Sequence, residues 1–108
     1  MPLKIFDFLR KKDESPETRE IFIDAGTFTD RVAAHDALKA AVVPAGEPYG
    51  RNLDALHDVL TSITVNTSVK ITGFGYARST LGDYAATMEK VFCDSAAENS
   101  RLQVTIED

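Results

Sequence analysis

The sequence contains a single cysteine, Cys93, and this scarcity removes several classes of protein from consideration. No disulfide can form within the chain, and a zinc site built on several cysteines is excluded. A lone thiol is typical of proteins in the reducing cytosol, so we expect a cytoplasmic protein. Because Cys93 falls in a predicted helix without an accompanying nucleophile set, we interpret it as a passive small side chain.

Long apolar runs are also missing. No segment approaches the roughly 20 apolar residues that a membrane-spanning helix needs. Residues 1–8 lack the apolar stretch and the small-residue cleavage site of a secretory signal. The mostly apolar residues 5–9, followed by the basic residues 10–12, are open to three interpretations: a membrane-surface anchor, a short docked helix or a frayed tail. We predict no association with a membrane.

Positive charge is in the minority. The chain has 12 lysines and arginines against 17 aspartates and glutamates, which gives a net charge of −5 at pH 7. Direct nucleic-acid binding needs a basic footprint that neutralises phosphates, so we expect none. An acidic chain instead permits fast, salt-sensitive association with a basic protein.

The length and composition predict one globular domain. The 108 residues are 44% hydrophobic and 27% charged, which is the balance of a chain that folds around its own core. Residues 13–17 form a polar, proline-containing linker. We therefore divide the chain into an N-terminal extension at residues 1–19 and a folded domain at residues 20–108.

Three short segments have the composition of strands. They occupy residues 20–24, 68–72 and 102–106, and each combines β-branched or aromatic side chains with neighbouring turn residues or polar residues. The last of them closes the domain.

The first two helices are predicted from apolar periodicity and from capping residues. Thr29 is expected to cap the first helix, with Val32 on its buried face, and Asn52 is expected to cap the second. His35 lies on the first helix and is interpreted as an ordinary surface or packing residue.

A third helix is predicted at residues 81–98, whereas residues 73–80 are expected to be irregular. The order of elements is then β-α-α-β-α-β. Because helices separate the strands, we predict an α/β fold in which helices pack against a three-stranded parallel sheet.

The second predicted helix carries the main chemical signal. On a helical wheel Leu56 and Leu60 fall on one side, while Asp54 and Asp58 fall nearly opposite and one turn apart. Like charges at this spacing destabilise a helix by about 0.2–0.5 kcal/mol. Asp54 recovers part of that cost from the helix N-terminus, whereas Asp58 lies beyond the first turn. The pair is either a solvated acidic face or a binding surface.

Other kinds of site fit the residues less well. Asp54, His57 and Asp58 have the spacing of metal ligands on one helix, but one histidine and two aspartates form a sparse set. The two carboxylates lack the enclosed cleft that acid–base catalysis needs. Gly73 and Gly75 follow a strand without the third glycine of a dinucleotide fingerprint. We predict no metal, no cofactor and no catalytic residue.

Residues 49–61 read YGRNLDALHDVLT. This run resembles the signature of the barstar family, the intracellular inhibitors of barnase-type ribonucleases, in the pattern Y-G-x-N-L-D-A-L-x-D-x-L-T. The order of elements over residues 20–107 is similar to the family as well, although the N-terminal segment has no counterpart there. The resemblance implies a barstar-like fold and a ribonuclease inhibitor that is not itself an enzyme.

The resemblance also implies roles for individual residues. In the family, the signature helix and the loop before it enter the active site of the ribonuclease. The second aspartate of the signature, here Asp58, takes the place of the substrate phosphate, and the first, Asp54, pairs with basic side chains. A carboxylate on the last helix, here Asp94, also reaches the enzyme. The implied partner-binding set is Tyr49, Gly50, Asn52, Asp54, His57, Asp58 and Asp94.

Two departures from the family pattern leave the partner open. His57 stands where the family has an aromatic residue, and Arg51 is basic where the inhibitor has an acid. A histidine there also permits binding that depends on pH. We predict an inhibitor of a barnase-type ribonuclease or a related toxin; the alternative is a barstar-fold module whose basic partner is not a ribonuclease. In both cases we expect a monomer when free.

Overall fold

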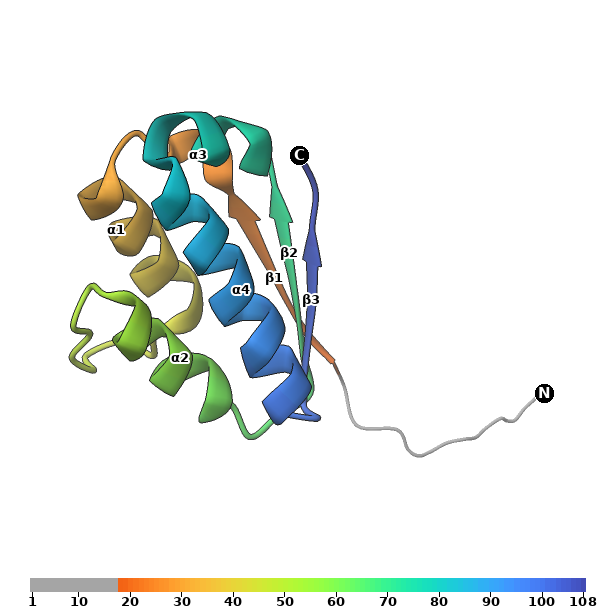
Figure 1. The fold of residues 1–108 in the computed structure, drawn as a ribbon. Helices are drawn as coiled ribbons and strands as arrows, with labels where there is room; N and C mark the ends of the chain where they lie inside the picture. The colour runs from red at the N-terminus through yellow and green to blue at the C-terminus, as the bar shows by residue number, and fades with distance from the viewer. Residues whose placement is uncertain (1–17) are drawn as a thin grey trace.

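The computed structural model describes residues 18–108, and the extension predicted at residues 1–19 lies almost wholly outside this range. The strands and helices follow one another in a single α/β unit (Figure 1). In chain order they are β1 (Arg19–Asp24), the 3-10 helix η1 (Ala25–Thr27), α1 (Arg31–Val42), α2 (Leu53–Thr61), β2 (Thr67–Thr72), α3 (Phe74–Leu81), α4 (Asp83–Glu98) and β3 (Leu102–Ile106).

The predicted sheet is confirmed. Its strands lie in the order β1-β2-β3 and all pairs are parallel, with Ile21 opposite Val69 and Val69 opposite Val104. Figure 1 shows the helices on one side of this sheet. Burial alternates along β2, because Val69 and Ile71 face the helices while Lys70 between them points away. The result is a two-layer fold in which one face of the sheet forms the floor of the core.

The prediction that residues 73–80 are irregular is wrong. Nearly all of them belong to α3, so the observed order is β-α-α-β-α-α-β, and α4 begins at Asp83 rather than at residue 81. Phe74 and Ala77 are fully buried and hold this short helix against the core. Gly73 lies in the left-handed region with φ 69°, and a Cβ there would lie 3.3 Å from the backbone nitrogen of Gly26. The glycine therefore makes the sharp exit from β2 and does not prevent a helix from starting directly after it.

The start of α1 also differs from the prediction. Asp30, not Thr29, is the N-cap, and its carboxylate accepts a 2.8 Å hydrogen bond from the backbone N–H of Ala33. The buried face is made by residues such as Ala34 and Leu38, whereas Val32 is 63% exposed. Within residues 18–108, no helix combines the length and the apolar character needed to cross a membrane.

Candidate partner-binding surface

Helix α2 is oriented as its sequence predicts. Leu56 and Leu60 are fully buried, and Asp54 and Asp58 are exposed on the opposite side. Asn52 caps the helix, because its side-chain oxygen accepts a 2.7 Å hydrogen bond from the N–H of Ala55. The capping role of Asn52 is confirmed, while a direct contact with a partner stays a prediction.

The other end of α2 is fixed by a buried residue that the sequence analysis did not single out. The side-chain amide of Asn99, just after α4, donates to the carbonyl oxygens of Leu60 at 2.9 Å and Ile63 at 3.0 Å. These carbonyls lie where the helix runs out of internal donors, so Asn99 satisfies them. Both ends of the acidic helix are thereby held by asparagine side chains.

The loop before α2 is tightly shaped. Arg51 adopts φ 51°, in the left-handed region, and its guanidinium donates to Asp36 of α1 at 2.8 Å. Gly50 is exposed, and a Cβ at this position would lie 3.3 Å from both the Ala55 side chain and the amide nitrogen of Asn52. A side chain at this position would therefore require these neighbours to shift by a few tenths of an ångström. Arg51, which is basic where the family has an acid, forms an ion pair within the chain, with Asp36.

The buried His35 holds the loop before α2 through a contact with Tyr49. The Nδ1 atom of His35 lies 2.7 Å from the hydroxyl of Tyr49, and its Nε2 atom lies 2.6 Å from the hydroxyl of Tyr84 on α4. His35 is 1% exposed, so it is a packing residue with both ring nitrogens bonded. Burial, aided by the charge of Arg51, lowers the pKa of His35. Burial raises the pKa of Tyr49 to about 12. The network therefore favours a neutral imidazole between protonated hydroxyls.

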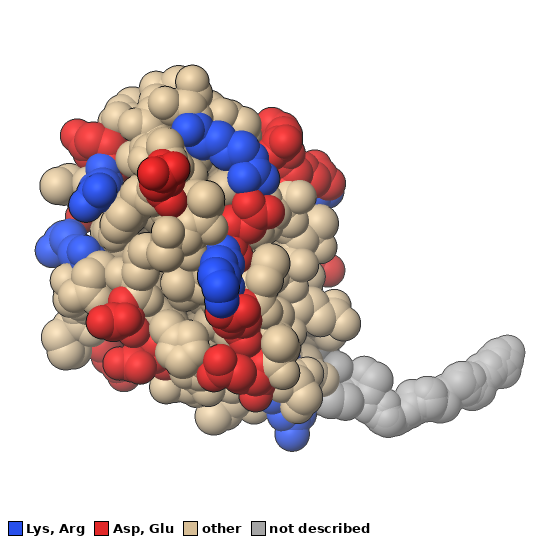
Figure 2. Space-filling view, viewed as in Figure 1, with Lys and Arg blue, Asp and Glu red and all other residues tan. Residues whose placement is uncertain are grey.

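Helix α4 contributes carboxylates beside α2. Asp94 is half-exposed and forms a 2.6 Å ion pair with Lys90 on its own helix. Glu98 lies 3.1 Å from the Nε2 atom of His57, which joins the two helices. Figure 2 shows acidic side chains over α2 and over the C-terminal part of α4, on the same face of the molecule. Glu98 thus lies beside the residues predicted to bind a partner, and this position follows from the packing of α2 on α4 rather than from a local sequence pattern.

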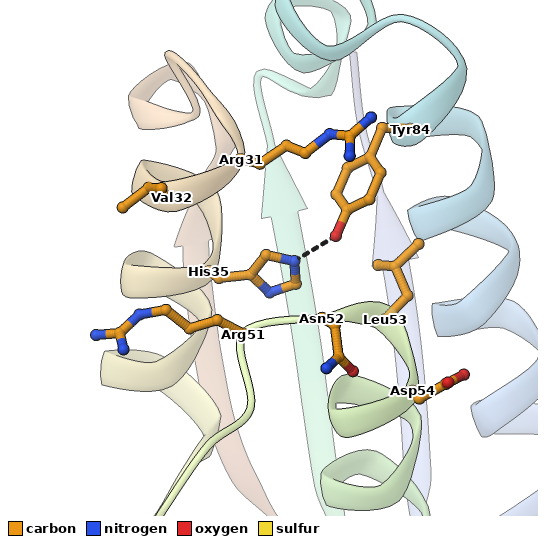
Figure 3. Close-up of a pocket in the computed structure, with 8 residues that line it drawn as sticks. All are labelled: Arg31, Val32, His35, Arg51, Asn52, Leu53, Asp54 and Tyr84. Carbon is orange, nitrogen blue, oxygen red and sulfur yellow. Dashed lines mark hydrogen bonds between the residues drawn. The ribbon is translucent and has the colours of Figure 1, made fainter.

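The two aspartates of α2 border different hollows. Asp54 lines a cleft of about 380 Å³ together with Arg31 and Tyr84 (Figure 3). Asp58 lines a hollow of about 450 Å³ whose apolar wall includes Val59 and Ile63. Each aspartate of α2 therefore lies at the edge of a different hollow.

The structure does not assemble the metal site considered from the sequence. Among residues 18–108, no group of three histidine, cysteine, aspartate or glutamate side chains lies close enough to hold a metal ion. His57, the nitrogen ligand of that alternative, is directed to Glu98. Cys93 is exposed on α4 and forms no disulfide.

The fold and this surface define a small two-layer α/β protein that displays carboxylates on a helix, next to a loop held by His35 and Asp36. Residues 18–107 match the family model described as Barstar (barnase inhibitor), and the chain therefore belongs to the barstar family. It is 33% identical over 81 residues to a protein of Bacillus subtilis (strain 168) named "Putative ribonuclease inhibitor YrdF", a match that covers 74% of this chain and 88% of that protein. The resemblance seen in residues 49–61 is confirmed, and the family is one of inhibitors rather than enzymes.

Proposed function

We propose that this protein inhibits a barnase-type ribonuclease by placing its acidic surface over the active site. The observation that carries the proposal is the pair Asp54 and Asp58, exposed on successive turns of α2 and opposite the buried Leu56 and Leu60. Packing fixes the helix, so the two carboxylates are presented without rearrangement. Membership of the barstar family supports the same activity.

The chemistry of a ribonuclease site explains why carboxylates suit the task. Such a site gathers cationic side chains and N–H donors to hold a phosphate group, and a carboxylate offers the same donors two charged acceptor oxygens. In this proposal Asp58 occupies the phosphate position, and Asp54 pairs with basic side chains beside it. Each carboxylate exchanges water for charged donors on the partner, which makes removal of one member costly.

The residues around the two aspartates have supporting roles in the proposal. Tyr49 and Gly50 form the rigid loop that packs against the enzyme, and Asn52 sets the direction of the helix. His57 and Asp94 flank the anchor residues. Because Asp94 is already paired with Lys90, we assign it a smaller share of the binding energy.

The net charge of −5 favours rapid capture of a basic enzyme. We propose that the protein acts as a cytoplasmic monomer, protecting the cell from a ribonuclease or related toxin before that enzyme leaves the cell. Binding driven by this charge weakens as ionic strength rises.

The test is inhibition of RNA cleavage by barnase and by other members of its family. Wild type is compared with Asp58→Asn and Asp54→Asn, and with Glu20→Gln as a control that removes the same charge from an exposed position on β1. Each helix variant is expected to weaken inhibition by at least about 100-fold, and the control by less than about threefold. If wild type protects RNA from none of these enzymes, or if all three variants lose equally little, the proposal is wrong.

A second candidate is a barstar-fold module that binds a basic protein other than a ribonuclease. It is favoured by His57, which is paired with Glu98 and offers a smaller contact area than tryptophan, tyrosine or phenylalanine would. Affinity capture with wild type and with a double charge reversal at Asp54 and Asp58 distinguishes the candidates. A non-nuclease partner that wild type captures and the double variant loses would support the second.

A further inference from the structure

The acidic surface includes one cleft whose charge is mixed. It lies between α1, the start of α2 and the first turn of α4, and its volume is about 380 Å³. Figure 3 shows Arg31 beside the Tyr84 ring, while the side chains of Asp54 and Arg51 point away from this pair on opposite sides. The full lining is Arg31, Val32, His35, Arg51, Asn52, Leu53, Asp54 and Tyr84.

Within residues 18–108, Arg31 is held in place without an ion-pair partner. Its guanidinium carbon lies 4.1 Å from the centroid of the Tyr84 ring, a cation–π contact, and Tyr84 is itself fixed by its hydrogen bond to His35. Within residues 18–108 Arg31 forms no ion pair, whereas Arg51 in the same lining is paired with Asp36. Its positive charge therefore remains available to an external anion.

The position of Arg31 works against helix stability. It is the first residue of α1, where the positive end of the helix dipole disfavours a cation. Asp30 beside it caps the helix, whereas the Arg31 guanidinium lies over the Tyr84 ring and has no carboxylate partner within residues 18–108. A cation that is unfavourable locally and oriented by Tyr84 suggests recognition of a partner.

We infer that this cleft accepts an acidic side chain of the partner protein, bound by Arg31, while a separate cation of the partner pairs with Asp54 elsewhere on the lining. The inference rests on the proposed function and specifies which ribonucleases the protein selects. A uniformly basic enzyme surface would be repelled by Arg31, whereas a surface with a carboxylate at this point would be attracted. Such a combination of attraction and repulsion gives discrimination between related enzymes.

The sign of one charge reversal tests the inference. Inhibition constants are measured for wild type, Arg31→Glu and Arg31→Gln against each ribonuclease that wild type inhibits. Lys39→Glu is the matched control, because Lys39 lies on the same helix but lines a separate cleft with Asp36 and Pro44. We expect Arg31→Glu to weaken inhibition of the cognate enzyme by at least about 30-fold, Arg31→Gln by about tenfold, and Lys39→Glu by less than about threefold.

If Arg31 faces a cation of the partner instead of a carboxylate, replacing it with glutamate will tighten binding. Tighter or unchanged inhibition by Arg31→Glu would overturn the inference and leave the proposed function standing, provided that Asp58→Asn still loses inhibition. Failure of wild type to inhibit any enzyme would overturn the proposed function, and the inference with it. Because glutamate is favoured at a helix N-terminus, Arg31→Glu is expected to fold.

The partner residue can then be found by reciprocal exchange. Each acidic residue near the active site of the inhibited ribonuclease is changed to lysine, and the variants are tested against Arg31→Glu. One lysine variant of the ribonuclease should bind Arg31→Glu at least about tenfold more tightly than the unchanged ribonuclease does. The same lysine variant should bind the wild-type inhibitor more weakly. If no acidic position shows this exchange, the cleft does not bind a carboxylate of that enzyme.

Discussion

The imidazole of His35 lies 2.7 Å from the hydroxyl of Tyr49, and this buried contact connects helix α1 to the loop that precedes the acidic helix. The other ring nitrogen lies 2.6 Å from the hydroxyl of Tyr84, so the same side chain also reaches α4. A neutral imidazole has one donor and one acceptor nitrogen, and the two hydroxyls can complement both. The shape of the loop before α2 therefore depends on a core histidine.

This arrangement predicts that stability decreases as the solution becomes mildly acidic. Burial and Arg51 lower the pKa of His35 in the folded protein from 6.5, so the unfolded chain takes up the proton more readily as the pH falls through this value. The free energy of unfolding should therefore be highest above pH 6.5 and should decrease below it. Urea denaturation of wild type between about pH 7.5 and 5.5 measures the slope.

The matched variants are His35→Gln and His57→Gln. The first should flatten the slope because its side chain does not titrate, even though its stability at neutral pH is lower. The second leaves His35 and its two hydroxyl contacts in place, so the part of the slope that His35 causes should remain. A slope that survives in His35→Gln would show that another group is responsible.

Loss of either tyrosine hydroxyl should destabilise the fold. Tyr49→Phe and Tyr84→Phe each leave one nitrogen of the buried His35 without its partner, which should cost about 1–2 kcal/mol. Tyr76→Phe is the control, because Tyr76 is 44% exposed and its hydroxyl makes no hydrogen bond within residues 18–108. Chemical denaturation compares the three. Equal stabilities would mean that the histidine contacts add nothing to folding.

Truncation of two phenylalanines should distinguish the core from the open face of the sheet. Phe74→Ala removes a fully buried ring from α3 and should cost about 3–5 kcal/mol. Phe22→Ala removes a ring that is 70% exposed on β1 and should change the free energy of unfolding by less than about 1 kcal/mol. Similar losses for the two variants would contradict the burial of α3.

The strands and α2 could be predicted because local signals agree there. The buried positions of β2 alternate, and Asn52 combines a strong N-cap with the leucine spacing of Leu56 and Leu60. The family signature at residues 49–61 implied partner-binding roles for individual residues, which the spacing of apolar residues could not indicate. These roles stay predictions, because the orientation of Asp54 and Asp58 makes contact possible without demonstrating it.

Helix α3 and the side-chain contacts between distant elements could not be predicted from the sequence, because they depend on tertiary packing. Helix α3 is short and begins after Gly73, so its sequence is typical of a loop, and burial of Phe74 decides its conformation. The bond from His35 to Tyr84 spans 49 positions in the chain, and the pair His57–Glu98 spans 41. Contacts at such separations leave no periodic pattern in the sequence.

The central claim is that Asp58 and Asp54 occupy the phosphate-binding centre of a ribonuclease. Competition measures this most directly: the dissociation constant of the complex with barnase, or with the member of its family that wild type inhibits, is determined at increasing concentrations of a 3′-mononucleotide that fills the active site. The apparent dissociation constant should rise linearly with nucleotide concentration, and in proportion to it once the nucleotide exceeds its own dissociation constant for the enzyme. A dissociation constant that does not change, with nucleotide and inhibitor bound together, would contradict it.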